Sequence, residues 1–166
     1  CQIAMVRIEP ECQAKKRNRH QRQPAKTGKK EFSIHIFRTV SQMRRFSSDL
    51  RRSGKTIAFV PTMGFLHQGH LSLMEKGKSL AARLVVSIFV NPTQFDRKED
   101  LESYPNSLET DLQMLKESGC DVVFVPTSED IYENKIASDS FDFDGLDKVM
   151  EGRYRKGHFD GVATIV

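Results

Sequence analysis

The sequence lacks a long apolar run, a paired-cysteine motif and an internal repeat. No stretch approaches the roughly 18 consecutive apolar residues of a membrane span, and the N-terminus has no apolar core of a secretory signal. The three cysteines, Cys1, Cys12 and Cys120, are scattered, without the spacing of a metal site or a disulfide framework. These absences exclude a membrane span and argue against a secreted or zinc-binding protein. We expect a cytoplasmic setting, structural thiols and no protein-bound metal.

Acidic residues are scarce in the first 30 positions. That segment holds nine Lys or Arg against only Glu9 and Glu11, a net charge of +7, and the remaining residues sum to −3. A segment with so little apolar periodicity cannot offset the entropy lost on ordering. We therefore predict a basic, disordered tail over residues 1–31, followed by one domain over residues 32–166. Three interpretations of the tail stay open: a solvated or spurious extension, a targeting segment, and an arm that binds nucleic-acid phosphates.

Short runs rich in Val, Ile and Phe recur in the domain without alternation of polar residues, which is typical of parallel strands buried on both faces. They lie at residues 56–60, 84–90 and 121–125, after a weaker strand pattern at 33–37. Helical patterns separate them, at residues 39–52, 70–82 and 107–118. This order predicts an open α/β sheet with right-handed crossovers. Because such sheets bind ligands at the carboxyl ends of their strands, we expect the site just after Val60 and Val90.

Local signals mark where two of these helices begin and end. Thr39 is a candidate N-cap, and Ser53-Gly54 follows the first helix as a glycine stop. In the helix at residues 107–118, Leu108, Leu112 and Leu115 form the apolar face, and Gly119 supplies the stop.

The loop after the first buried strand carries the strongest chemical signal. Residues 61–70 read Pro-Thr-Met-Gly-Phe-Leu-His-Gln-Gly-His and run directly into a helix. Gly64 and Gly69 let the backbone approach a bulky anion, and the helix N-terminus offers unpaired amides with a partial positive charge. His67 and His70 add side-chain donors for phosphate oxygens, as a nucleotidyl transfer requires. Incidental spacing and metal ligation are the alternatives, but no third ligand stands out nearby.

The same loop resembles the HxGH signature of the nucleotidyltransferase superfamily that includes class I aminoacyl-tRNA synthetases. Pro61-Thr62-Met63-Gly64 is similar to the corresponding loop of the pantothenate synthetase (pantoate–β-alanine ligase) family, and more motifs follow in family order. They lie at residues 87–95, 100–101, 104–105, 121–126, 131–132, 151–153 and 157–162. The resemblance covers about residues 33–166 and implies an open parallel Rossmann-like nucleotidyltransferase sheet.

The resemblance implies a two-step ligation that belongs to coenzyme A biosynthesis. ATP, accompanied by Mg²⁺, and (R)-pantoate would form pantoyl adenylate with loss of pyrophosphate. The amine of β-alanine would then displace AMP to give pantothenate. Family members are commonly homodimers, and we expect small-molecule substrates, with neither nucleic acid nor membrane as a partner.

The resemblance also assigns site residues. The ATP site would be lined by Met63, Gly64, Phe65, Leu66, His67, Gln68, Gly69 and His70. His67 and His70 would be the catalytic pair on the phosphates. Gln94 would bind pantoate and mark the β-alanine position. Met63 and Phe95 would supply the apolar contact for pantoate's gem-dimethyl carbon, and Asn91 would support the same pocket. For Tyr104 and Tyr132 we expect packing, with the hydroxyl at the surface.

The chain ends at Val166 inside a helical pattern, and we expect a C-terminally truncated fragment. It lacks the family's Gly-Glu-Lys-Asp segment, second pantoate glutamine, Lys-Met-Ser-like loop and small C-terminal domain. We therefore expect an exposed apolar sheet edge beside the first buried strand, poor ATP binding and no catalysis by this polypeptide alone. The alternatives are a related nucleotidyltransferase with another acceptor, an inactive remnant, and a nucleic-acid-binding protein acting through residues 1–30.

Overall fold

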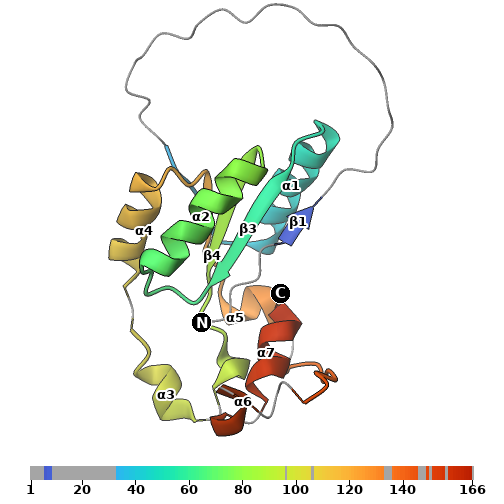
Figure 1. Ribbon diagram of the computed structural model, residues 1–166, viewed down its shortest axis with the longest axis vertical. Helices are drawn as coiled ribbons and strands as arrows, with labels where there is room; N and C mark the ends of the chain where they lie inside the picture. The colour runs from blue at the N-terminus through green and yellow to red at the C-terminus, as the bar shows by residue number, and fades with distance from the viewer. Residues whose placement is uncertain are drawn as a thin grey trace, which may run out of the picture.

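The chain folds as an α/β protein around one mostly parallel sheet (Figure 1). The computed structural model describes residues 6–8, 33–95, 97–105, 107–132, 136–145, 149, 151–155 and 157–165. The strands, in spatial order, are β1 (Val6–Ile8), β3 (Ile57–Thr62), β4 (Arg83–Ile88), β5 (Val122–Phe124) and β2 (His35–Phe37). All neighbours from β3 to β2 are parallel, whereas β1 pairs with β3 antiparallel. The predicted open parallel α/β sheet is confirmed.

The central strands are buried because their branched side chains fill both faces of the sheet. In β4, Leu84, Val85 and Val86 are all fully buried, and their side chains alternate between the two faces. Leu84 and Val86 join the larger apolar cluster, and Val85 joins the smaller one. A continuous apolar run with no polar alternation is therefore the sequence pattern of this strand.

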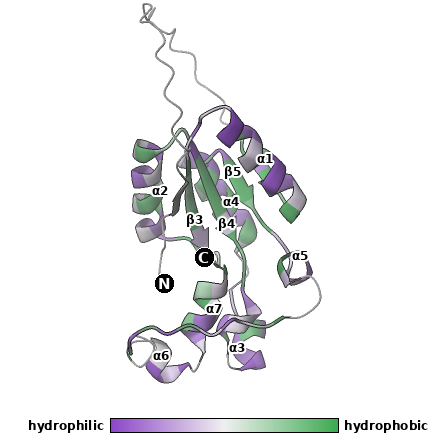
Figure 2. Cartoon of the chain, turned by 90° about the vertical axis from the view of Figure 1, so that its right-hand side faces the viewer, coloured by the Kyte–Doolittle hydropathy of each residue, from purple (hydrophilic) through white to green (hydrophobic). Residues whose placement is uncertain are grey.

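Three helices cover the two faces. Helix α2 (Gln68–Leu80) and helix α4 (Leu108–Glu117) contribute Met74 and Leu115, both fully buried, to the larger cluster. Helix α1 (Val40–Arg52) packs Leu50 on the opposite face, and Figure 2 shows α1 and α2 on either side of the strands. The predicted helices are therefore confirmed, with boundaries within two residues of those expected.

The predicted boundary signals of two helices are also confirmed. Thr39 caps α1 in a reciprocal capping box with Gln42. Gly54 and Gly119 end α1 and α4 with φ values of 69° and 70°, which glycine adopts without steric cost. The Cys120 thiol that follows is buried, and burial raises its pKa to about 12, in keeping with the structural role expected for it.

The first strand of the sheet corrects two expectations. Val6–Ile8 falls in the tail that we predict to be disordered, yet it forms β1 against Ile57–Phe59 of β3. The open edge of β3 presents backbone donors and acceptors, and this segment pairs with them, so the edge expected to be exposed is covered over those three residues. The other residues of the segment 1–31 lie outside the described residues. No helix in the described part of the chain is long and apolar enough to span a membrane.

A second layer lies beyond the carboxyl ends of the strands (Figure 1). It consists of a 3-10 helix, η1 (Pro92–Gln94), and of α3 (Lys98–Glu102), α5 (Ser128–Tyr132), α6 (Glu151–Tyr154) and α7 (His158–Ile165). Gly161 of α7 packs so closely on η1 that an added Cβ would lie 2.7 Å from the Thr93 carbonyl oxygen. The glycine therefore permits the contact that joins α7 to the end of β4.

Candidate functional site

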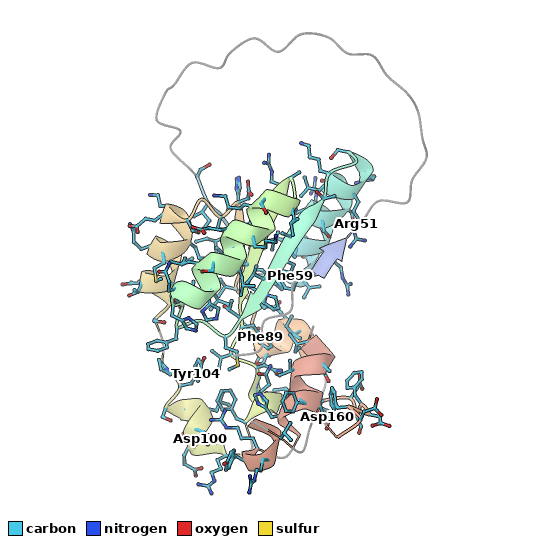
Figure 3. All side chains as sticks on the ribbon, viewed as in Figure 1. Arg51, Phe59, Phe89, Asp100, Tyr104 and Asp160 are labelled. Atoms are coloured by element: carbon cyan, nitrogen blue, oxygen red, sulfur yellow. The ribbon has the colours of Figure 1, made fainter. Side chains whose placement is uncertain are left out.

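A cavity of about 430 Å³ opens at the carboxyl ends of β3, β4 and β5. Its lining includes Met63 and Gly64 after β3, Phe89 and Val90 after β4, and residues 125–128 after β5. The remaining wall comes from α3, the start of α4 and the segment between them, and Figure 3 shows Tyr104 in that region. The cavity lies where the sheet topology predicts a ligand, after the carboxyl ends of β3, which contains Val60, and of β4, which ends two residues before Val90.

The two histidines cap helix α2 reciprocally. His67 is the N-cap, and its Nδ1 accepts a hydrogen bond of 3.1 Å from the Gly69 amide. His70 is the third helical residue, and its Nδ1 accepts a hydrogen bond of 3.2 Å from the His67 amide. The ring centroids lie 4.1 Å apart. The HxGH motif is therefore a capping box in which imidazoles replace the usual hydroxyl and carboxamide.

This capping determines which nitrogen carries the proton. A neutral imidazole that accepts at Nδ1 holds its hydrogen on Nε2. Burial lowers the pKa of His70, and the neighbouring His67 lowers it further, whereas Asp111 raises it in part. His70 is only 1% exposed, so near neutral pH it is a neutral ring whose donor is Nε2–H. Both histidines thus offer Nε2 as a hydrogen-bond donor at the positive end of α2.

The structure corrects in part the expectation that the helix N-terminus offers unpaired amides to an anion. The Gly64 amide donates to Thr62 Oγ1, and the amides of residues 65, 66, 67 and 69 all donate to side chains of this chain. The His70 amide donates to the His67 carbonyl oxygen. Because these amides are already paired, an anion bound here would rely on the imidazole Nε2 atoms and the helix dipole more than on these amides.

Asp111 is a site residue that sequence reasoning missed. Its buried carboxylate accepts the amides of Phe65 and Leu66, at 2.9 Å each, and the Ser107 hydroxyl, also at 2.9 Å. It lies on α4, yet it binds the loop that precedes α2. A signal was present: Asp111 falls between Leu108 and Leu115 on the apolar face of its helix, where an unpaired carboxylate would be unfavourable.

Gln94 is the last residue of η1 and Asn91 is its N-cap, and neither lines the cavity. Gln94 is half-buried, and its backbone carbonyl oxygen lies 3.3 Å from Nδ1 of His158. Asn91 is 1% exposed, and its Nδ2 donates to the Gly161 carbonyl oxygen at 3.0 Å. Its Oδ1 accepts from the Thr93 amide and hydroxyl. Asn91 therefore holds η1 against α7, and its expected support of a pantoate pocket stays a prediction.

One of the two tyrosine hydroxyls, that of Tyr132, differs from the expectation. The Tyr132 hydroxyl donates to Asn91 Oδ1 at 2.6 Å and does not lie free at the surface, because the buried amide oxygen needs donors from the surrounding helices. Tyr104 lines the cavity, and burial, with the nearby Asp111, raises its pKa. It is therefore a neutral hydroxyl that can donate to a ligand oxygen.

The site offers no ready-made metal centre. Among the residues that the structure describes, no three His, Cys, Asp or Glu side chains come together to hold a metal ion. The two histidines use Nδ1 to accept backbone amides, so neither ring is free to ligate through that atom. The arrangement suits hydrogen bonding to an anion better than metal ligation.

A mostly parallel sheet in which a helix begins directly after the loop of a buried central strand defines a Rossmann-like fold. The chain belongs to the pantoate-beta-alanine ligase family, whose sequence model matches residues 35–166. It is 52% identical over 132 residues to the pantothenate synthetase of Flavobacterium psychrophilum, covering 79% of this chain and 47% of that protein. It is 51% identical over 134 residues to the pantothenate synthetase of Vibrio parahaemolyticus, covering 80% and 44%.

Solved structures agree with this assignment. A pantoate-beta-alanine ligase from Francisella tularensis, described as complexed with beta-gamma ATP and beta-alanine, superposes with a TM-score of 0.73 at 39% identity. That match covers 80% of this chain and 51% of the other. The pantothenate synthetase of Thermus thermophilus superposes with a TM-score of 0.68 at 41% identity, covering 79% and 46%. The chain thus spans about half the length of the relatives that it matches.

Proposed function

We propose that this chain supplies the phosphate-binding part of a site that ligates (R)-pantoate and β-alanine at the expense of ATP. The observation that carries this function is the reciprocal capping of His67 and His70, which places two Nε2 donors at the N-terminus of α2. A neighbouring cavity of about 430 Å³ is large enough for a small carboxylic acid. Family membership and the ATP and β-alanine named for the Francisella tularensis structure support the choice of substrates.

The substrates would divide between the loop and the cavity. ATP would lie along residues 63–70, with its phosphates at His67 and His70. Pantoate would occupy the cavity, where Met63 and Phe89 offer apolar contact for its gem-dimethyl carbon. Gln94, at the end of η1, lies outside the cavity lining and would approach pantoate from there. Its side-chain amide suits this substrate because it can both donate to a carboxylate and accept from a hydroxyl.

The chemistry is carboxylate activation followed by amide formation. A pantoate carboxylate oxygen attacks the α-phosphorus of ATP, the bond to the bridging oxygen breaks, and pyrophosphate leaves. Negative charge develops on the α-phosphate oxygens, and Nε2–H of His67 and His70 stabilises it by hydrogen bonding. The β-alanine amine then attacks the acyl carbon, AMP leaves, and the amine loses a proton. His70 acts here as a neutral donor, in keeping with its lowered pKa.

Mg²⁺ would enter with ATP as part of the substrate, held by the phosphates. A cytoplasmic setting and a homodimeric complete enzyme are part of the same proposal.

Isothermal titration of ATP·Mg²⁺ into the 166-residue chain tests the proposed binding of ATP. We expect weak binding heat that disappears in His70→Ala and persists in His35→Ala, an exposed histidine at the far edge of the sheet. Titration of pantoate then tests the cavity, with Met63→Ala as the variant. Equal heats in His70→Ala and the parent chain would exclude His70 from phosphate binding.

A further inference from the structure

Three consecutive amides of the HxGH loop donate to side chains in succession. The Phe65 amide donates to Oδ2 of Asp111 and the Leu66 amide to Oδ1, both at 2.9 Å. The next amide, that of His67, donates to Nδ1 of His70 at 3.2 Å. Peptide units are planar, so orienting the amides of residues 65 and 66 restricts the direction in which the following amide can point. The Asp111 carboxylate and the His70 ring are thereby connected through one short piece of backbone.

The backbone of this loop needs an external anchor. Gly64 has φ 84° and Phe65 has φ 52°, so two successive residues occupy the left-handed region. That region is unfavourable for phenylalanine, and its side chain is 60% exposed, so packing does not compensate. The hydrogen bonds that the Phe65 and Leu66 amides donate to Asp111 compensate for this unfavourable backbone conformation. Ser107 strengthens the anchor, because its hydroxyl donates to Oδ2 at 2.9 Å and also accepts the Phe65 amide at 3.2 Å.

The space around the anchor is closed. A Cβ added to Gly64 would lie 3.0 Å from Oδ2 of Asp111 and 3.3 Å from Cγ2 of Ile88. Asp111 is 2% exposed and comes from α4, which is held beside α2 by a hydrogen bond from Lys78 Nζ to the Ser118 carbonyl oxygen. The loop conformation is therefore set by a helix about 45 residues further along the chain.

We propose that Asp111, assisted by Ser107, is a positioning residue that sets the protonated nitrogen of His70. By holding the amides of Phe65 and Leu66, it aims the His67 amide at Nδ1 of His70 and leaves Nε2 as the donor. Asp111 itself touches no reacting atom in this role. Its importance for catalysis rests on the proposed function, because it acts through a His70 that binds phosphate.

Asp111→Asn is the diagnostic variant, because it keeps the size of the side chain. A carboxamide has one acceptor oxygen, and its NH₂ group would face an amide donor, so one of the two anchoring bonds is lost. Asp121→Asn is the matched control. Asp121 also accepts a backbone amide, that of Leu84 at 2.8 Å, but it lies at the other end of the sheet.

Nuclear magnetic resonance of the isotope-labelled, full 166-residue chain gives a readout separate from activity. Long-range ¹H–¹⁵N spectra report which ring nitrogen of His70 is protonated, and hydrogen exchange reports the amides of Phe65 and Leu66. In Asp111→Asn we expect exchange at these amides to rise about tenfold, the loss of one charge-assisted bond. We also expect His70 to populate both tautomers. In Asp121→Asn both signals should match the parent chain.

If Asp111→Asn does not fold, Ser107→Ala still tests the positioning role of Asp111 and Ser107. It removes a partner of the Phe65 amide and of Oδ2 but leaves the Leu66 bond, so exchange should rise more at Phe65 than at Leu66. A folded Asp111→Asn chain with an unchanged His70 tautomer would overturn the assignment. So would a folded Ser107→Ala chain with unchanged exchange at Phe65.

ATP·Mg²⁺ titration separates this role from the proposed function. Where the parent chain binds, we expect Asp111→Asn to weaken binding about tenfold, equivalent to about 1.4 kcal/mol, with no change in Asp121→Asn. Equal affinity in Asp111→Asn and the parent chain would overturn the role in binding. No binding by the parent chain, together with the expected tautomer change, would contradict the proposed function and support the positioning of His70 by Asp111.

Discussion

The sheet and the layer beyond the carboxyl ends of its strands are each stabilised by a different kind of interaction. The sheet with α1, α2 and α4 is stabilised by apolar contacts, with Leu84, Val86 and Leu115 fully buried. In the layer after Val90, the hydrogen bonds of one buried amide, Asn91, join η1 to α7 and to Tyr132 of α5. Apolar packing is spread over many side chains, whereas a buried polar junction depends on every partner being present. The layer beyond the strand ends should therefore be the more sensitive to a single polar change.

The sheet should show the largest effect in global stability. Leu84→Ala would leave a cavity between β4 and α2, because Leu84 is fully buried in the larger cluster. We expect a loss of about 2–5 kcal/mol in the free energy of unfolding, measured with urea. Leu80→Ala, at a side chain that is 40% exposed, is the control and should change little. Equal losses of stability in the two variants would contradict the conclusion that buried apolar contacts stabilise the sheet.

Asn91→Leu tests the polar junction. It removes the donor to the Gly161 carbonyl oxygen and the acceptor of the Tyr132 hydroxyl, leaving both buried groups without this partner. We expect a cost of about 2–3 kcal/mol, concentrated in hydrogen exchange of α7 and smaller in the sheet. Gln113→Leu, on the exposed face of α4, is the control. Uniform destabilisation of sheet and α7 would mean that the two halves unfold as one unit.

Gly161→Ala tests the close contact between α7 and η1. The added methyl would lie 2.7 Å from the Thr93 carbonyl oxygen, so one element must shift. We expect a loss of about 1–3 kcal/mol by the same exchange measurement. At an unhindered helical position the same change stabilises by about 0.5–1 kcal/mol, so a neutral or stabilising result would refute the tight contact.

The smallest effect should come from His70 and depend on pH. Its pKa is lowered in the fold by burial and then by His67, so the unfolded chain binds the proton more readily. The stability that this group contributes is complete above its ordinary pKa of 6.5 and is lost as the pH falls through the folded value. Urea unfolding at pH 7.5 and 5.5 measures the loss. We expect a smaller difference in His70→Asn, which keeps an acceptor but does not titrate; an equal difference would assign the pH dependence to other groups.

Local signals were enough to predict much of the fold and part of the site. The runs of Val, Ile and Phe indicated buried parallel strands, and Thr39, Gly54 and Gly119 marked helix ends, because capping and left-handed φ depend on neighbouring residues alone. The HxGH loop was identified from its place between a buried strand and a helix and from its resemblance to a family signature. The placement of the cavity followed from the rule that parallel strands share one carboxyl edge.

The sequence by itself thus determined the α/β order, the helix ends and the chemical nature of the loop after β3, because each depends on residues close together in the chain. Only the tertiary structure decided that Asp111 binds the amides of that loop, that Asn91 joins η1 to α7, and that Val6–Ile8 pairs with β3. Those contacts join residues about 45, 70 and 50 positions apart. Local periodicity cannot reveal such partners, since a buried donor or acceptor finds its match only after the elements have packed.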